Sequence, residues 1–305
     1  MNVIEASGLG KCYGNTWALQ NCTLAIPDGH VVALVGPNGA GKTTLLNVAV
    51  GLTAPTEGGL SVLGGIRPGS AAALDGIAFV AQNMPLYANL SVADMLHLTS
   101  NLNWQFDQSY ARSRLAELGI PLDRKTSKLS GGQQAQLALT LALARRPKLL
   151  VMDEPMASLD PLARHDFMAT VMVAVADHGV SVVLSSHVLA ELERVADYFV
   201  LLSRGNVQVA GEVDDLMACH RVLTGPASEA DSYIDRLPIV KATRAETQVH
   251  LLIRTHGPAE PVPPGWESHP VSLEELTLAY LREPGASSLP GPAHARSSEQ
   301  MDVAK

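Results

Sequence analysis

The sequence predicts an α/β protein built on a mainly parallel β-sheet. Four short apolar runs, at residues 31–35, 77–80, 149–152 and 180–184, have the length and composition of buried parallel strands. A glycine-rich segment at residues 36–41 separates the first run from a helical pattern over residues 42–50. Helical patterns also separate the last three runs, as right-handed crossover connections require.

Residues 83–147 differ in character and predict an inserted α-helical subdomain. The segments 92–102, 108–118 and 133–145 have helix-period apolar residues without strand signals. After residue 220 the patterns weaken to one alternating stretch, 248–253, and one helix candidate, 273–281. We therefore expect a first domain over residues 1–220 and a small α+β accessory region over 221–283. The composition of residues 284–305, rich in Pro, Ser, Gly and Ala, is typical of disorder.

Composition limits the classes of function. With 305 residues and 47% hydrophobic content, the chain is long enough for one large domain and a small appendage. A net charge of -8 argues against a nucleic-acid binder that relies on a general basic surface. The three cysteines are odd in number and lack metal-ligand spacing, so we expect reduced thiols. The apolar stretches end well short of a bilayer span, so another chain would have to cross any membrane involved.

Residues 36–43 fit the phosphate-loop pattern G-x-x-x-x-G-K-[ST], between a buried strand and a helix. In such a loop the backbone N–H groups surround phosphates, the lysine reaches the β- and γ-phosphates, and the threonine hydroxyl binds Mg²⁺. The alternative is an ordinary glycine-rich turn, but the strand and helix context favours ATP binding. The predicted ATP-binding residues of this segment are Gly36, Pro37, Asn38, Gly39, Ala40, Gly41, Lys42, Thr43 and Thr44.

Two carboxylates, Asp153 and Glu154, end an apolar strand and should lie at the edge of the sheet beside the phosphate loop. Asp153 fits the acid that holds Mg²⁺, and Glu154 is the candidate that orients and deprotonates the attacking water. Two acids that end a strand are most often a helix cap or a solvated turn. The neighbouring phosphate loop makes the catalytic interpretation the stronger one.

A third motif lies between the phosphate loop and the acidic strand: Leu129, Ser130, Gly131, Gly132 and Gln133. Two glycines at the start of a long apolar helix expose N–H groups to an anion, although Ser130 could equally be a simple N-cap. The pentapeptide resembles the signature of ATP-binding cassette (ABC) ATPases, and the resemblance extends over most of residues 1–215.

That resemblance implies roles for further residues. Tyr13 matches the family's adenine-stacking aromatic residue, and Gln82 matches the glutamine that touches Mg²⁺ or the attacking water. His187 resembles the histidine that contacts the γ-phosphate. Three residues resemble the loop that crosses the dimer interface: Ser158, Leu159 and Asp160.

Two departures from the family's pattern stand out. Residues 156–158 read Met-Ala-Ser where Thr-Ser-Gly is common, so we expect a stiffer interface loop. Residues 135–137 read Ala-Gln-Leu in place of Gln-Arg-Val, which removes a basic residue from the signature helix.

The resemblance implies an N-terminal antiparallel β subdomain and two cassettes, as a homodimer or a heterodimer, that share ATP and Mg²⁺ head to tail. It also implies a cytoplasmic subunit held at the inner face of the cell membrane by a separate permease, with no nucleic-acid partner. A groove near residues 82–90 would receive that permease, although the segment could instead be a packed corner of the helical insert. The helix candidate near residues 272–280 resembles the closing helix of bacterial drug and antibiotic exporter subunits. An importer subunit and a non-transport ABC ATPase are the alternatives.

Overall fold

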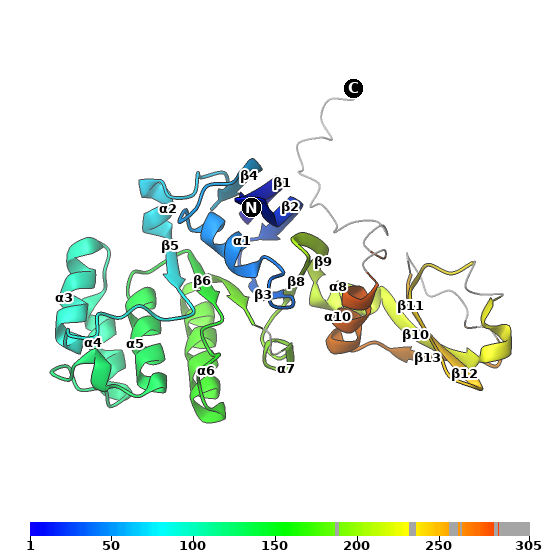
Figure 1. The fold of residues 1–305 in the computed structure, drawn as a ribbon. Helices are drawn as coiled ribbons and strands as arrows, with labels where there is room; N and C mark the ends of the chain where they lie inside the picture. Colours follow the sequence, from blue (N-terminus) through cyan, green and yellow to red (C-terminus); the bar gives the residue numbers. More distant parts are fainter. Residues whose placement is uncertain (187–188, 232–235, 256–261, 263, 284–285, 287–305) are drawn as a thin grey trace, which may run out of the picture.

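The computed structural model describes residues 1–186, 189–231, 236–255, 262, 264–283 and 286. Two sequence predictions therefore lie outside the described residues: the role of His187, and the disorder of residues 284–305 apart from Ala286. Figure 1 shows the chain with its elements labelled.

A six-stranded sheet forms the centre of the molecule, in the order β5-β6-β7-β3-β8-β9. The pairs β5 with β6, β6 with β7, β7 with β3 and β3 with β8 are parallel, and β9 is antiparallel to β8. The strands span β3 (Val31–Val35), β5 (Ile77–Val80), β6 (Leu149–Asp153), β7 (Ser181–Ser185), β8 (Tyr198–Ser203) and β9 (Asn206–Glu212). The predicted mainly parallel sheet is confirmed.

Opposite faces of this sheet pack against different layers because successive side chains of a strand point to opposite faces. Val32 and Leu34 lie in one apolar cluster with helix α1 (Lys42–Ala49) and a three-stranded antiparallel sheet. That sheet has the order β2-β1-β4 and consists of β1 (Asn2–Tyr13), β2 (Thr16–Pro27) and β4 (Glu57–Val62); α2 (Ala71–Gly76) follows it. It is the N-terminal β subdomain that the family resemblance implied.

The other face of the sheet lies against long helices. Ala33 shares a cluster with side chains of α5 (Gly131–Leu143), α6 (Pro161–His178) and α10 (Leu273–Arg282). Helix α5 belongs to the helical insert, which also contains α3 (Val92–Leu102), α4 (Gln108–Glu117) and the short 3-10 turn η1 (Thr126–Lys128). The insert has an apolar core of its own, in which Leu96, Leu115 and Leu137 are buried.

The chain after β9 forms a second antiparallel sheet, in the order β11-β12-β10-β13. Its elements are α8 (Val213–Ala218), β10 (His220–Pro226), η2 (Ala227–Glu229), β11 (Ile239–Arg244), β12 (Gln248–Arg254) and β13 (Glu267–Pro270), and α7 (Leu189–Leu192) precedes β8. Only β12 and α10 were predicted from the sequence. Helix α10 buries Leu276 and Tyr280 in the cluster that also contains side chains of α6, and its first residue, Leu273, donates its backbone N–H to Glu193 Oε1 at 3.1 Å.

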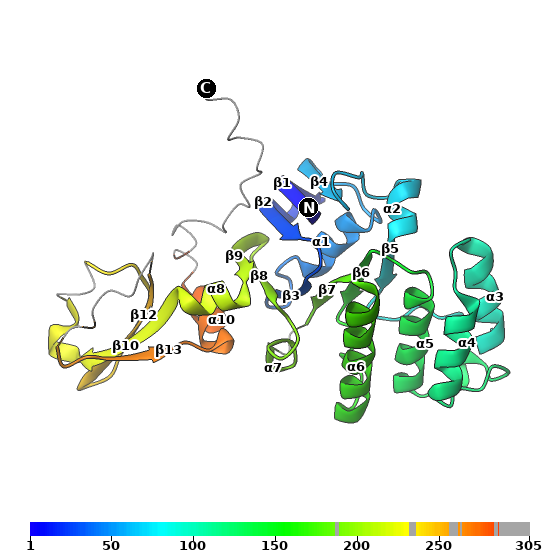
Figure 2. The same ribbon diagram turned by 180° about the vertical axis from the view of Figure 1, so that it is seen from behind.

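The helical insert and the second antiparallel sheet lie at opposite ends of the molecule, with the central sheet between them, in both Figure 1 and Figure 2. The insert is therefore connected to the rest of the chain mainly through the packing of α5 against the central sheet and α6.

Candidate functional site

The phosphate loop joins buried β3 to α1 in the manner that the sequence predicts. Gly41 is the N-cap of α1 and has a φ of 105°, a conformation that favours glycine. A Cβ atom on Gly41 would also lie 2.6 Å from the carbonyl oxygen of Ala18, so another side chain would clash there. Gly205 donates its backbone N–H to Ala40 O at 3.0 Å, which ties the loop to the turn between β8 and β9.

Lys42 lies beneath this loop with 5% of its surface exposed. Its Nζ donates to Gly36 O at 2.7 Å and approaches Pro37 O at 3.4 Å. The same ammonium group lies 3.5 Å from Glu154 Oε1. A buried ammonium group requires such partners because burial without them costs several kcal/mol, on the order of 2–7 for a polar group and more for a charge. The loop therefore places one positive charge next to the carboxylate of Glu154, the predicted catalytic base.

The two acids at the end of β6 are held differently. Asp153 is buried, and Oγ of Ser185 on the adjacent strand β7 donates to its Oδ1 at 2.7 Å. Glu154 has a φ of 44°, which is strained for a residue with a side chain. Its backbone N–H donates to Ser185 Oγ at 2.9 Å and lies 3.2 Å from Ser185 O, so the strained turn is fixed to β7.

Ser185 is a site residue that the sequence analysis missed. Its hydroxyl bonds both acids, and the parallel register sets it directly beside Asp153. A serine at the end of an otherwise apolar buried strand was the available signal, but it does not indicate which neighbouring strand the hydroxyl faces.

A pocket of about 450 Å³ brings most of the predicted catalytic and phosphate-binding residues together. Gln82, in the turn after β5, and Glu154 line it together with the loop and the start of α1. The lining residues are Ala18, Asn38, Gly39, Ala40, Gly41, Lys42, Thr43, Thr44, Gln82 and Glu154. The other predicted residues that the structure describes do not line it: Tyr13, Gly36, Pro37, residues 129–133, Asp153 and residues 158–160.

The signature segment lies instead at the exposed start of α5. Ser130 is the N-cap of the helix, and its Oγ accepts the backbone N–H of Gln133 at 3.2 Å. The Gln133 side chain returns a bond to the backbone N–H of Ser130 at 3.1 Å, which completes a capping box. Ser130 is thus an N-cap, which is the structural alternative that the sequence left open for it. A serine hydroxyl that accepts one hydrogen bond can still donate its own proton, so this role does not exclude anion binding.

The predicted interface loop ends at α6. Asp160 is the N-cap of that helix and accepts the backbone N–H of Ala163 at 3.0 Å. Leu159 is buried, whereas Ser158 and Asp160 are exposed. The starts of α5 and α6 are close together, because a Cβ atom on Gly132 would lie 3.2 Å from Ala163 Cβ.

Tyr13 ends β1 with half of its surface, 50%, exposed. Lys11 Nζ lies over its ring, 5.0 Å from the centroid, and donates to Ala54 O at 2.8 Å. The ring is therefore accessible at the surface and has a cation on one face.

Comparisons with known proteins identify the family of this chain. A family model described as ABC transporter matches residues 19–157. A lantibiotic transport ATP-binding protein of Streptococcus pyogenes is 31% identical over 214 residues, which cover 70% of this chain and 92% of that protein. This chain belongs to the ABC transporter ATP-binding family.

Other ABC proteins are similar to a comparable degree. A Nod factor export ATP-binding protein of Rhizobium etli is 32% identical over 255 residues, covering 78% of this chain and 80% of that protein. An Fe(3+) ions import ATP-binding protein of Pseudomonas fluorescens is 34% identical over 222 residues, covering 69% of this chain but 62% of that protein.

Solved ABC structures share the fold. An ATP-binding subunit of an ABC transporter matches with a TM-score of 0.64 and 29% identity, over 71% of this chain and 92% of that one. A dimeric bacterial ABC transporter cassette matches with a TM-score of 0.60 and 26% identity, over 69% of this chain and 98% of that one.

The ABC family assigns ATP binding and ATP hydrolysis to this chain. ABC cassettes dimerise and work with membrane permeases. In the described part of this ABC chain, none of the helices has both the length and the apolar character of a membrane span.

We predict that Ser185→Ala lowers ATP hydrolysis about tenfold, because it removes the hydroxyl that bonds the Asp153 carboxylate and the backbone N–H of Glu154. It should also lower the free energy of unfolding by about 1–3 kcal/mol, since a buried carboxylate loses its donor. ATPase rates and thermal melting measure the two effects.

Ser181→Ala is the matched control. Ser181 lies at the other end of β7, and its Oγ makes the same pair of bonds, from Gly29 N at 2.8 Å and to Asp28 Oδ1 at 2.6 Å. We expect this variant to lose stability but keep its ATPase rate. Equal ATPase losses in the two variants would contradict a specific role for Ser185.

Proposed function

We propose that this chain is the ATP-hydrolysing subunit of an ABC exporter and completes each catalytic site only with a second cassette. The observation that carries the proposal is the separation of two surfaces. The pocket around Lys42 and Glu154 has no lining residue from the signature segment, which lies exposed at the start of α5. A second cassette, identical or different, would supply its own signature to this pocket.

Within the pocket, we assign Glu154 as the general base. Its carboxylate lies 3.5 Å from Lys42 Nζ, the group expected to meet the γ-phosphate. ATP would have to bind this lysine in place of the carboxylate. The carboxylate could then orient a water molecule and accept its proton. Gln82 lines the same pocket and would contact that water or the metal, and His187 would contact the γ-phosphate.

The oxygen donors fit Mg²⁺. Thr43 offers a hydroxyl, Gln82 an amide oxygen and Asp153 a carboxylate, and hard cations prefer such oxygen ligands. Among the described residues there is no group of three or more His, Cys, Asp or Glu side chains that could hold a metal ion. Mg²⁺ needs none, because it is usually held by one or two protein ligands together with substrate phosphates. When bound, the ion neutralises charge that develops on the transferred phosphoryl group.

The remaining roles belong to the dimer. Leu129, Ser130, Gly131, Gly132 and Gln133 would meet the partner's nucleotide, and Ser158, Leu159 and Asp160 would cross the interface. Tyr13 would stack on adenine, as its exposed ring permits. We assign this ATPase work to residues 1–220, with the helical insert at about 83–147, and regard residues 221–283 as an accessory region.

Export of a small molecule is favoured over import by the share of each relative's length that this chain covers. The lantibiotic transport and Nod factor export relatives are covered over 92% and 80% of their lengths, whereas the iron import protein is covered over 62%. The exporter names also suggest a drug, antibiotic or lipid-like substrate. An importer subunit is the second candidate, because import proteins match with similar identity.

We propose that the permease docks in a groove of about 190 Å³ between the central sheet and the helical insert. The loop after β5 lines it with Met84, Pro85 and Leu86, whose apolar character suits a protein contact. Gln82 lies two residues before Met84 and lines the nucleotide pocket. One short loop would therefore contact both the nucleotide and the permease. The chain would then work in the cytoplasm, on the inner face of the membrane.

We predict that Glu154→Gln keeps ATP binding but slows hydrolysis by about 10² or more, because the amide cannot accept the proton. Steady-state ATPase rates and equilibrium nucleotide binding test this. Glu246→Gln, at an exposed residue of the C-terminal sheet region, is the control and should behave as the parent protein. An unchanged rate for Glu154→Gln would refute its role as the base.

We predict that Ser130→Arg abolishes turnover without preventing ATP binding, because its bulk and charge would block the second cassette. Gel filtration with ATP, in the Glu154→Gln background, should show the loss of the ATP-dependent dimer. Ser228→Arg places the same side chain at an exposed position in the C-terminal region and should dimerise normally. ATP-dependent dimerisation of Ser130→Arg equal to that of the control would count against the shared site.

The permease proposal predicts that the full chain, purified from membranes, retains an integral-membrane protein. Pro85→Glu introduces a charge at an exposed position of the groove and should reduce that retention while the ATPase rate of the free subunit stays unchanged. Equal retention of the same membrane protein by Pro85→Glu and by the parent chain would exclude the groove as its docking site.

A further inference from the structure

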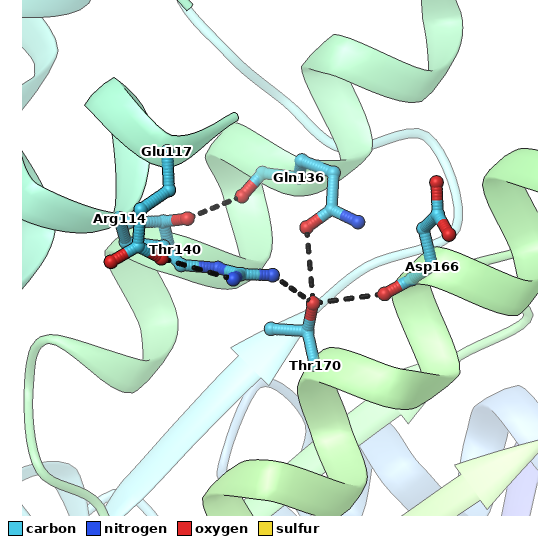
Figure 3. Close-up of polar contacts among 6 residues, drawn as sticks. All are labelled: Arg114, Glu117, Gln136, Thr140, Asp166 and Thr170. Atoms are coloured by element: carbon cyan, nitrogen blue, oxygen red, sulfur yellow. Dashed lines mark hydrogen bonds and ion pairs between the residues drawn. The ribbon is translucent and has the colours of Figure 1, made fainter. Parts of the chain in front are cut away.

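Two helices of the insert meet α6 at a polar contact between Arg114 of α4, Gln136 of α5 and Thr170 of α6 (Figure 3). The guanidinium Nη2 of Arg114 donates to Thr170 Oγ1, and Gln136 Oε1 lies 3.5 Å from that same hydroxyl. Thr170 and Gln136 are 5% and 8% exposed. We call these three residues the three-helix contact.

The hydroxyl of Thr170 is the centre of this contact. It donates its only proton to Asp166 O, 2.9 Å away in the preceding turn of α6. Its oxygen then accepts the hydrogen bond from Arg114, and this single atom is the contact of the Arg114 guanidinium with α6. Gln136 is fixed on its own helix as well, since Thr140 Oγ1 donates to Gln136 O at 2.7 Å.

Stability does not explain why an arginine occupies this place. Its other partner is Glu117, whose Oε2 lies 3.4 Å away and whose side chain is 63% exposed, so this ion pair contributes little. Arg114 Nε is buried and has no hydrogen-bond partner among the residues that the structure describes. Replacing Arg114 by an apolar side chain of similar volume would leave no buried charge unpaired, because Thr170 is neutral and Glu117 is exposed.

The position of the three-helix contact explains the presence of an arginine better than stability does. Helix α5 begins at Ser130 and α6 begins at Asp160, and both N-caps belong to segments that we assign to the dimer interface. With a rise of about 1.5 Å per residue, the contact lies about 9 Å along α5 and about 15 Å along α6 from these caps. Near the caps the same two helices touch again, where Gly132 faces Ala163. Two contacts at different levels fix how far α5 can slide or tilt against α6.

We propose that Arg114 is a positioning residue for ATP hydrolysis. Through Thr170 it ties α4 to α6. Because α4 and α5 share the apolar core of the insert, this bond also holds Ser130 in register with Asp160, and so shapes the surface that completes the partner's site. The proposal rests on the proposed shared site.

The test uses Arg114→Met and Thr170→Val, which keep side-chain volume while removing the charge or the hydroxyl. We expect kcat for ATP to fall about tenfold in each, because small displacements of a catalytic surface have large effects. KM for ATP should change less than about twofold, since the phosphate loop is untouched. The double variant should be no slower than either single variant, because both remove one interaction.

Two further variants separate positioning from folding. Arg114→Lys retains a donor for Thr170 and should recover most of the lost kcat. Arg112→Met, at an exposed arginine on the same helix, should leave kcat unchanged. Melting temperatures close to that of the parent protein in all variants would show that the fold is intact.

An unchanged kcat in Arg114→Met, additive losses in the double variant, or no recovery with lysine would each overturn the proposal. These results are distinct from failure of the shared site itself. That failure would appear as normal ATP-dependent dimerisation by Ser130→Arg, whatever Arg114 does.

Discussion

The site depends on the order of three adjacent parallel strands, β6, β7 and β3, at the centre of the sheet. Parallel strands end at the same edge, so the phosphate loop after β3 and the acids after β6 lie on one side of the molecule. Strand β7, which lies between them, contributes Ser185, whose hydroxyl bonds Asp153 and the backbone of Glu154. The spacing between the lysine and the base is therefore fixed by main-chain pairing, which is stiffer than any arrangement of surface loops.

The pairing of Lys42 with Glu154 has a consequence for nucleotide binding. In this structure the ammonium group is already satisfied by Gly36 O and by the Glu154 carboxylate. In the proposed reaction, the γ-phosphate would compete with this carboxylate for the ammonium group of Lys42. That competition would couple nucleotide binding to the proposed role of Glu154 as the general base.

The sequence predicted the parts of this molecule whose residues interact locally. The strands around residues 31–35, 77–80 and 149–153 are continuous buried runs, and the helices of the insert have clear periodicity, so local pattern was sufficient. The C-terminal sheet was mostly missed because its strands alternate weakly: β13 is exposed throughout and β11 has one buried residue, Val240. Ser185 and Arg114 act through partners 31 and 56 residues away in sequence, and no local pattern identifies such partners.

Helix α5 determines how the insert can move relative to the sheet. It buries Leu137 and Leu141 in the core of the insert, and Ala135 and Leu139 in the cluster beneath the central sheet. A helix with two buried faces cannot rotate about its own axis without exposing one of them, so its remaining freedom is to slide or tilt. Apolar contacts resist such small displacements only weakly, because they lack direction. The directional hydrogen bond from Arg114 of α4 to Thr170 of α6 is therefore well suited to set the final position of the insert, and with it the start of α5.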